Sequence, residues 1–505
     1  MPADEKQYLL GIDVGNTVIK AVLFDLDGER VASYAIDGQS TTPEPGHVER
    51  DLEELWRNAR EALQHCIVAA GIDPRQIVAA GCAGHGNGLY LLDHDDRPLV
   101  GIQSLDTRAA GVAGELAAAH GDALHAAALQ EPWPSQTPVL LAWMRQNRPE
   151  VIERAGTLLM CKDYITFKLT GQKVSDISDM SGAGLLKMPE CRYDDELLAL
   201  YGLDGLRSLL PRLVDPTEIA GTVTADAAAQ TGLAEGTPVV GGLFDVIASA
   251  LGAGVVETGA TSIIAGTWSV NQYLAEEPVV NRDVLMVAAF GSERFMIMDN
   301  SATSASQLEW YVREFVERGS HHDDPFGFCH LRLAEVAPRI DDPYFHPYLY
   351  GSPQGAEHRA GFNGVAGWHG EGHLIRALFE GVVFEHRRHI ERLRDAGAQI
   401  DKATLSGGGS RSAVWGQMLA DCLRLPIAVA AEDETGALGA ALSAGVGAGV
   451  FPDYEAAAAR MTRTRHVYQP DAVMSAHYDR RFRVSRDLAT VLHGFWDAQH
   501  QDAQS

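Results

Sequence analysis

The feature that most constrains the fold is a strand–turn–strand pattern that occurs once near the N-terminus and again after the middle of the chain. Residues 8–25 contain two apolar runs joined by a short turn at Gly15-Asn16, and residues 262–270 contain a similar pair with a turn at Gly266-Thr267. Each pattern predicts an antiparallel hairpin. One hairpin alone would be ordinary, but one opening each half of the chain favours a duplicated architecture.

The composition of the two turns is suited to phosphate. Glycine and threonine in a turn can offer backbone N–H groups and hydroxyls to phosphate oxygens, and a neighbouring aspartate can hold Mg²⁺ through water. An ordinary hairpin without a ligand is the alternative, and the repetition favours nucleotide binding. The predicted contacts are Asp13, Gly15, Asn16 and Thr17 in the first hairpin and Gly266 and Thr267 in the second.

Asp245 stands between the two hairpins. It follows the apolar run 238–244, which includes Gly241-Gly242, and precedes small residues at helical spacing. It could be a plain N-cap, with its carboxylate accepting backbone N–H groups of the helix. It could instead be a carboxylate placed at the positive end of that helix to accept a proton. Its position between the hairpins favours the second interpretation. We therefore expect Asp245 to be the catalytic base and, with Asp13, a metal ligand.

Two further glycine-rich segments bear on binding. Residues 81–88 break a strand with four glycines, and His85 and Asn87 there can hydrogen-bond hydroxyl groups, although a turn with a solvated histidine fits the spacing equally well. Residues 403–423 read as a strand, three glycines and a helix with an open N-terminus. Missing side chains would let an adenine or ribose lie against the backbone, so nucleotide contact is favoured over a plain loop at Gly407, Gly408, Gly409 and Ser412.

Composition excludes several classes of function. A chain of 505 residues is long enough for two domains. Its formal charge of -27 would repel nucleic acid and anionic membranes. Six scattered cysteines form neither a disulfide framework nor a zinc motif, and the sequence shows no signal peptide and no membrane-spanning run. We expect a cytoplasmic protein without nucleic-acid or membrane partners; the oligomeric state stays open, a homodimer being one arrangement.

Taken together, these patterns resemble the FGGY family of carbohydrate kinases, in the actin and sugar-kinase superfamily. The resemblance extends from about Leu9 to about Val450. It includes the longer pattern AGFNGV at residues 360–365, followed by matching positions within residues 373–380. This second pattern is far more specific than either hairpin.

The resemblance implies an α/β fold with two ribonuclease-H-like domains and a cleft between them. Its expected boundaries are a sugar-binding domain over residues 1–250, a nucleotide-binding domain over 251–490 and a loose tail over 491–505. It also implies phosphoryl transfer from ATP, with Mg²⁺, to a terminal hydroxyl of a small sugar. In that reaction Asp245 accepts the hydroxyl proton or orients the oxygen, Asp13 carries Mg²⁺ through water, and Lys20 assists at the phosphates.

The resemblance further implies which residues contact the sugar: His85, Asn87, Asp106, Arg108, Asp245 and Trp268. Ser104-Leu105 departs from the aromatic-Asn pair common before this aspartate in the family. Trp268 stands where smaller residues are common and would shorten the pocket. The acidic and hydroxyl-rich segment 176–181 resembles the region that closes over the substrate, but it suits a capping loop equally well.

These features favour a ketopentose kinase of the xylulose or L-xylulose type, with an erythritol or polyol kinase as the nearest alternative. A sugar or nucleotide sensor without catalysis is a second alternative. The joint presence of Asp13, Asp245, both turns and the glycine triplet disfavours it. A third, an actin-like ATPase, would not require the polar segments 81–108 and 176–181.

Overall fold

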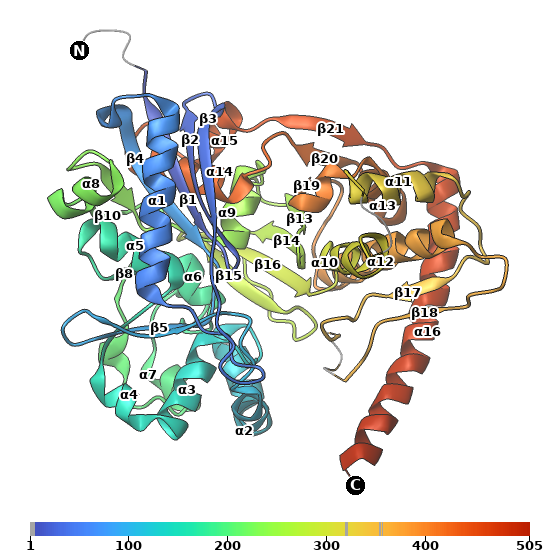
Figure 1. The fold of residues 1–505 in the computed structure, drawn as a ribbon. Coiled ribbons are helices and arrows are strands. Elements are labelled where there is room, and N and C mark those ends of the chain that lie inside the picture. Colours follow the sequence, from blue (N-terminus) through green and yellow to red (C-terminus); the bar gives the residue numbers. More distant parts are fainter. Residues whose placement is uncertain (1–5, 319–321, 353–354, 356, 505) are drawn as a thin grey trace. The chain divides into compact units, whose positions relative to one another are not determined.

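The computed structural model describes residues 6–318, 322–352, 355 and 357–504 (Figure 1). The chain forms two compact units. The first contains residues 1–258, 274–297 and 434–463, and the second contains residues 259–273, 298–433 and 464–505. The sequence predicts a single boundary at 250/251, whereas in this division the chain returns twice to the first unit.

The first unit is built on a mixed sheet with the strand order β10-β11-β4-β1-β2-β3, and β12 also pairs with β4. The strands of this sheet are β1 (Tyr8–Val14), β2 (Val18–Asp25), β3 (Arg30–Asp37), β4 (Ile77–Gly84), β10 (Ile219–Thr222), β11 (Pro238–Val240) and β12 (Leu243–Phe244). Smaller sheets contain β5 (Leu89–Asp93), β6 (Pro98–Ile102), β7 (Ala155–Leu159), β8 (Val174–Asp176) and β9 (Arg212–Val214).

Helices and 3₁₀ turns complete the first unit. They are α1 (Leu52–Ala70), α2 (Ala110–Ala128), α3 (Thr137–Asn147), α4 (Pro149–Arg154), α5 (Cys161–Thr170), α6 (Ile177–Gly182), α7 (Asp195–Leu200), α8 (Ala225–Thr231), α9 (Asp245–Gly252), α14 (Thr435–Gly447), α15 (Tyr454–Met461), η1 (Pro74–Gln76) and η2 (Arg207–Leu209). The ends of α1 follow from the sequence. Asp51 accepts hydrogen bonds from the N–H groups of Glu53 and Glu54, and Gly71 ends the helix at φ 62°.

The second unit has a related sheet, with the order β15-β16-β14-β13-β19-β20-β21. Its strands are β13 (Thr261–Ala265), β14 (Ser269–Ala275), β15 (Met286–Phe290), β16 (Arg294–Ser301), β19 (Ala403–Ser406), β20 (Ile427–Ala430) and β21 (Thr464–Tyr468); residues 274–297, including β15, belong to the first unit. The remaining elements are β17 (Tyr344–His346), β18 (Gly361–Asn363), α10 (Ser306–Tyr311), a π-helical turn (Val312–Val316), α11 (Pro325–Ala334), α12 (Glu371–Asp395), η4 (Gly408–Arg411), α13 (Ala413–Leu423) and α16 (Ala472–Gln504).

The predicted duplication is confirmed by strand pairing. In the first unit, β1 pairs antiparallel with β2 and parallel with β4. In the second unit, β13 pairs antiparallel with β14 and parallel with β19. Each half thus has a hairpin whose first strand lies beside a later parallel strand, and each of those later strands runs into a glycine-rich segment, at 84–88 and at 407–409.

The C-terminal segment differs from the expected loose tail. Helix α16, the red helix that ends at the C-terminus in Figure 1, continues to Gln504. Its earlier part is anchored by buried side chains, including Tyr478, Phe482 and Ala489. Neither proline nor glycine occurs between residues 495 and 504, so the helix meets no strong breaker there. Within the described residues, no helix is both long and apolar enough to span a membrane.

Helix α14 packs on the first sheet with its backbone close to that of its neighbours. Side chains of β1 alternate, so Leu10 and Ile12 join the core cluster that includes α1, while Gly11 lies on the opposite face, towards α14. A Cβ atom at Gly11 would clash with the carbonyl oxygen of Ala437 in α14. A Cβ atom at Gly439 would clash in the same way with the backbone of α9. These small residues therefore set the distance between α14, β1 and α9.

This packing predicts that Gly439→Ala lowers the free energy of unfolding by about 1–3 kcal/mol, because the added methyl group must push α14 away from α9. The matched control is Gly114→Ala in α2, where a Cβ atom meets no neighbour within 4 Å. Removing a glycine from a helix interior should stabilise the control by about 0.5–1 kcal/mol. Thermal and urea unfolding would measure both. Equal stability of the two variants would contradict the packing argument.

Candidate active site

The first hairpin turn is fixed by hydrogen bonds to its carbonyl oxygens. The guanidinium of Arg50 donates to the oxygen of Gly15 at 3.1 Å, and Nε2 of Gln103 donates to the oxygen of Asn16 at 2.8 Å. In a planar trans peptide the N–H points away from the C=O. The N–H groups of Asn16 and Thr17 therefore point away from these donors, and Thr17 is exposed. This orientation is suitable for binding an anion.

Asp13 is the penultimate residue of β1, close to this turn, and lies opposite Lys20 in the β1–β2 ladder. Nζ of Lys20 is 2.6 Å from Oε2 of Glu434, so the cation predicted to contact phosphate is held by an acid at the start of α14. Burial raises the pKa of Asp13 to about 6; the charge of Lys20 opposes this rise and that of Glu434 adds to it.

Asp245 is the first residue of α9, directly after β12. The N-cap position belongs to Phe244, and no side-chain cap is found for this helix among the described residues. Asp245 is therefore not the N-cap of α9, and the plain N-cap interpretation is wrong. Burial raises the pKa of Asp245 to about 8; the charge of Asp13 raises it further, and a hydrogen bond from the N–H of Val246 lowers it. The two carboxylates are close enough to repel each other.

A buried ionic cluster lies in α5, β8 and α6. Nζ of Lys162 contacts Oδ1 of Asp163, lies 2.6 Å from Oδ2 of Asp176 and lies 3.7 Å from Oδ2 of Asp179. One ammonium group thus faces three carboxylates. Burial raises the pKa of Asp179 well above its ordinary value; the charge of Lys162 lowers it, and the charges of the other acids, Asp245 among them, raise it.

The unsatisfied polar atoms of this region lie next to the glycine-rich segment 84–88. Oδ1 of Asn87 and both carboxylate oxygens of Asp179 are buried, and none accepts a hydrogen bond from any described residue. A Cβ atom at Gly86 would lie 3.0 Å from Oδ1 of Asp179, so this acid approaches the segment directly. Buried polar atoms without partners are uncommon in proteins, and a ligand hydroxyl would satisfy them.

His85, Asp106 and Arg108 already have partners. Nε2 of His85 is 2.8 Å from the Tyr90 hydroxyl, and burial lowers the pKa of His85 to about 3, so its ring is neutral. Oδ2 of Asp106 accepts from the N–H of Val48 at 2.6 Å, and both its oxygens accept from Nε of Arg108 at 3.0 Å. Arg108 also donates to Glu49 at 2.8 Å. Asp106 and Arg108 therefore hold each other in place through hydrogen bonds and an ion pair.

In the second unit, the turn after β13 repeats the arrangement of the first. The N–H of Ala305 donates to the oxygen of Gly266 at 2.9 Å, and the hydroxyl of Ser306 donates to the oxygen of Thr267 at 3.0 Å. By the same peptide geometry, the N–H groups of Thr267 and Trp268 point away from these donors. Thr267 and Trp268 are both exposed, and Trp268 has 37% of its surface accessible.

The three glycines after β19 have different surroundings. Gly407 adopts φ +82°, and a Cβ atom there or at Gly409 would press against Ala265. A Cβ atom at Gly408 would meet no atom within 4 Å, so open space lies over this position. The hydroxyl of Ser412 caps α13 by accepting from the N–H of Trp415 and lies 2.9 Å from Nε2 of His330. Ser412 is therefore engaged in capping, and Gly408 is the open position of the segment.

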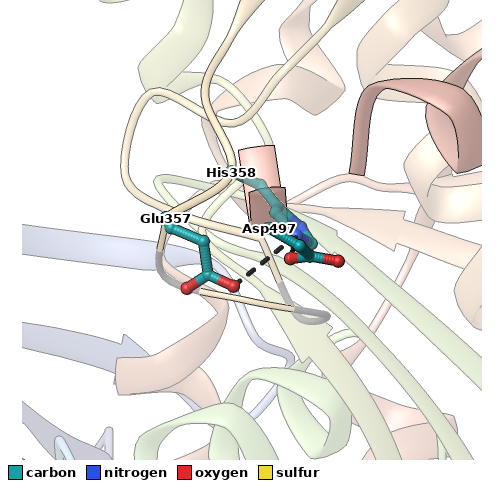
Figure 2. A group of neighbouring side chains, drawn as sticks. All are labelled: Glu357, His358 and Asp497. Atoms are coloured by element: carbon teal, nitrogen blue, oxygen red, sulfur yellow. Dashed lines mark hydrogen bonds and ion pairs between the residues drawn. The ribbon is translucent and has the colours of Figure 1, made fainter. Parts of the chain in front are cut away.

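A separate group of side chains in the second unit could also hold a cation. Figure 2 shows Glu357 and Asp497 beside His358. The atoms of these three side chains that could bind a metal all lie within 4.8 Å of one another. His358 is buried, and its Nε2 is 3.0 Å from Oδ1 of Asp497 and 3.7 Å from Oε1 of Glu357. These distances describe an ion-pair group that fastens α16 to residues 357–358, and we assign it that role.

The N-terminal domain model of the FGGY family of carbohydrate kinases matches residues 8–252, and the C-terminal domain model matches residues 261–448. The L-xylulose/3-keto-L-gulonate kinase of Escherichia coli K12 is 33% identical over 499 residues, which cover 97% of this chain and 98% of that protein. The erythritol kinase of Brucella abortus is 28% identical, covering 98% of each chain. The crystal structure of a xylulose kinase from Rhodospirillum rubrum has a TM-score of 0.87 and 28% identity, covering 97% of this chain and 100% of that one.

The raised pKa of Asp245 predicts how stability depends on pH in metal-free buffer. The unfolded chain releases this proton near the ordinary value of 3.8, whereas the folded chain keeps it up to about 8. The folded state therefore binds more protons between these values, and the free energy of unfolding falls as pH rises. Asp245→Asn, which cannot ionise, should lose less stability from pH 5 to 8.5. Melting temperatures in EDTA would show this, and parallel curves for the two proteins would contradict it.

Proposed function

The chain belongs to the FGGY family of carbohydrate kinases and is a sugar kinase, and we propose that it phosphorylates the terminal hydroxyl of a ketopentose of the xylulose type. The observation that carries this proposal is the pair of repelling carboxylates, Asp13 and Asp245, in which the pKa of Asp245 rises to about 8. A base with a pKa near neutrality is well matched to accept the proton of a sugar hydroxyl. A sensor without catalysis would not require this pair.

The same pair fits Mg²⁺. Burial raises the pKa of both carboxylates, and the charge of Asp13 raises that of Asp245 further, so a divalent cation would stabilise the pair; oxygen ligands are those that Mg²⁺ prefers. Asp13 and Asp245 are the residues that would hold the ion, which would neutralise charge on the ATP phosphates. Beside Asp13 in the first unit, the N–H groups of Asn16 and Thr17 suit phosphate oxygens, and in the second unit the N–H groups of Thr267 and Trp268 do so too.

The polar groups of the first unit support a neutral polyhydroxy substrate. Asn87 and Asp179 have buried oxygens that accept no hydrogen bond from a described residue, and such oxygens suit sugar hydroxyls. Arg108 is paired on two sides, by Asp106 and Glu49, so it is a poor clamp for a carboxylate. We therefore propose a neutral pentulose as substrate and add Asp179 to the sugar contacts. The similarity to an L-xylulose/3-keto-L-gulonate kinase and to a xylulose kinase supports the ketopentose class.

The proposal is tested by ADP release over L-xylulose, D-xylulose, erythritol, glycerol, 3-keto-L-gulonate and gluconate. We expect the highest kcat/KM with a xylulose, and Asp245→Asn should lower kcat at least ~10²-fold, the usual contribution of a positioned base. Asp226→Asn is the matched control, since Asp226 is an exposed acid in the first turn of α8. Turnover of gluconate or glycerol alone would refute the substrate class. Full activity of Asp245→Asn would refute the assigned base.

The open position at Gly408 makes a second prediction, about the nucleotide. Gly408→Val should fold, because a Cβ atom at this position meets no protein atom within 4 Å, and should raise KM for ATP about tenfold or more by occupying ligand space. KM for the sugar should stay within about twofold. Gly367→Val, at another open loop position, is the control. Equal changes in both KM values would show that the segment is not a nucleotide contact.

A further inference from the structure

An Asp–His–Ser arrangement is buried in the second unit, apart from every residue assigned above. Nδ1 of His389, on α12, is 2.6 Å from Oδ2 of Asp299 on β16. Nε2 of the same ring is 2.7 Å from Oγ of Ser301 at the end of β16. The exposed fractions of Asp299, His389 and Ser301 are 3%, 1% and 4%. A buried serine with this little exposure is not accessible as a nucleophile, so the arrangement has another role.

The hydrogen bonds continue from Ser301 towards the second turn. Oγ of Ser301 is 2.7 Å from Oγ1 of Thr303, which is 3.2 Å from Oγ of Ser269. Ser269 is the first residue of β14 and directly follows Trp268 in the turn. The buried side chains Asp299, His389, Ser301, Thr303 and Ser269 thus form one continuous series, which we call the hydroxyl chain.

The carboxylate of Asp299 holds one end of the hydroxyl chain. A carboxylate accepts hydrogen bonds, so Nδ1 of His389 donates to Asp299, and Nε2 of the same ring is bonded to Ser301. Each hydroxyl can donate one hydrogen bond and also accept, so Ser301 and Thr303 can each bond both of their neighbours in the series. Such a network holds its members in one conformation when every member is satisfied.

A second histidine of α12 supports the same segment. Nδ1 of His386 is 2.9 Å from Oδ1 of Asn271 on β14, and Nε2 is 3.4 Å from Oγ of Ser304. Burial lowers the pKa of His386 to about 3, so this ring is neutral. The two histidines therefore connect α12 both to β14 and to residues 301–304.

The segment so held is the one that orients the turn. Residues 301–304 lead directly to Ala305 and Ser306, whose donors fix the carbonyl oxygens of Gly266 and Thr267. Fixing these oxygens also fixes the opposite N–H groups of Thr267 and Trp268. We propose that His389 is a positioning residue, which acts through Ser301 and Thr303 to hold the phosphate-facing N–H groups of the second turn in place. The phosphate part of this inference rests on the proposed function.

Thr303→Val tests the hydroxyl chain, because it removes the central hydroxyl at nearly constant shape, and Thr303→Ser should restore it. The first measurement uses the free protein and does not depend on activity. Amide hydrogen exchange at Ala305, the donor to Gly266, should be about tenfold faster in Thr303→Val than in wild type, as expected for loss of a buried hydrogen bond. Thr303→Ser should exchange at the wild-type rate.

The second measurement is kinetic. Thr303→Val should lower kcat/KM for ATP about tenfold and leave KM for the sugar within about twofold, with recovery in Thr303→Ser. Tyr348→Phe is the matched control: it deletes another buried hydrogen bond to α12, from the Tyr348 hydroxyl to Glu385 at 3.0 Å, away from the turn. Its exchange at Ala305 and its ATP kinetics should equal those of wild type.

The outcomes separate the inference from the proposed function. Unchanged exchange at Ala305 in Thr303→Val, or failure of Thr303→Ser to restore it, would overturn the positioning role. Altered exchange without any kinase activity in the wild type would instead refute the proposed function and leave the positioning role standing. If Thr303→Val does not fold, Ser301→Ala interrupts the chain one member earlier and is held to the same criteria.

Discussion

The close backbone packing of α14 is the constraint on which the first unit's site depends. Glycines on β1, β4 and α9 remove the side chains that would keep α14 at an ordinary distance. At the start of α14, Gly436 lies against the carboxylate of Asp13, where a Cβ atom would be 2.6 Å from Oδ2. Glu434 just before it pairs with Lys20. One helix therefore sets the surroundings of the predicted metal ligand and of the nearby cation, and it packs against α9, which carries Asp245.

The two hairpin turns orient their N–H groups in the same way, but different residues fix the carbonyl oxygens in each. Each turn has its carbonyl oxygens fixed on one side, and trans peptide geometry then directs the following N–H groups to the other side. Arg50 and Gln103 supply the donors in the first unit, whereas Ala305 and Ser306 supply them in the second. Both units therefore have the same strand arrangement, but the groups that fix the turn differ between them.

Much of this organisation could be predicted from the sequence, because it depends on local patterns. The paired hairpins, the strand–helix junction at Asp245 and the limits of α1 follow from spacing and turn residues. The partners of Asp106 and Arg108 could not be predicted, since Glu49 and Val48 approach them only in the folded chain. The different surroundings of the three consecutive glycines could not be predicted either. Their spacing does not distinguish Gly408, which faces open space, from Gly407 and Gly409, which pack on Ala265.

Contacts between residues far apart in the chain also explain why the roles of Asp179 and the hydroxyl chain could not be predicted from the sequence. The acidic segment 176–181 looked as much like a capping loop as a site, and Asp176 does cap α6. Asp179 is distinguished only in the folded chain, by buried carboxylate oxygens that accept no hydrogen bond from a described residue and by its approach to Gly86. Likewise His389 lies some 90 residues from Asp299 and Ser301 along the chain, so no local pattern connects them.

The discontinuous division of the chain has a consequence for biosynthesis. Strand β1 is synthesised long before α14, the helix that covers Gly11, because α14 begins only at Thr435. The first unit therefore cannot close around its own N-terminal strand until most of the polypeptide has been made. Contacts of such high sequence separation are slow to form and leave apolar surface exposed meanwhile. A nascent chain of this protein should depend on protection of that surface until residues 434–463 emerge.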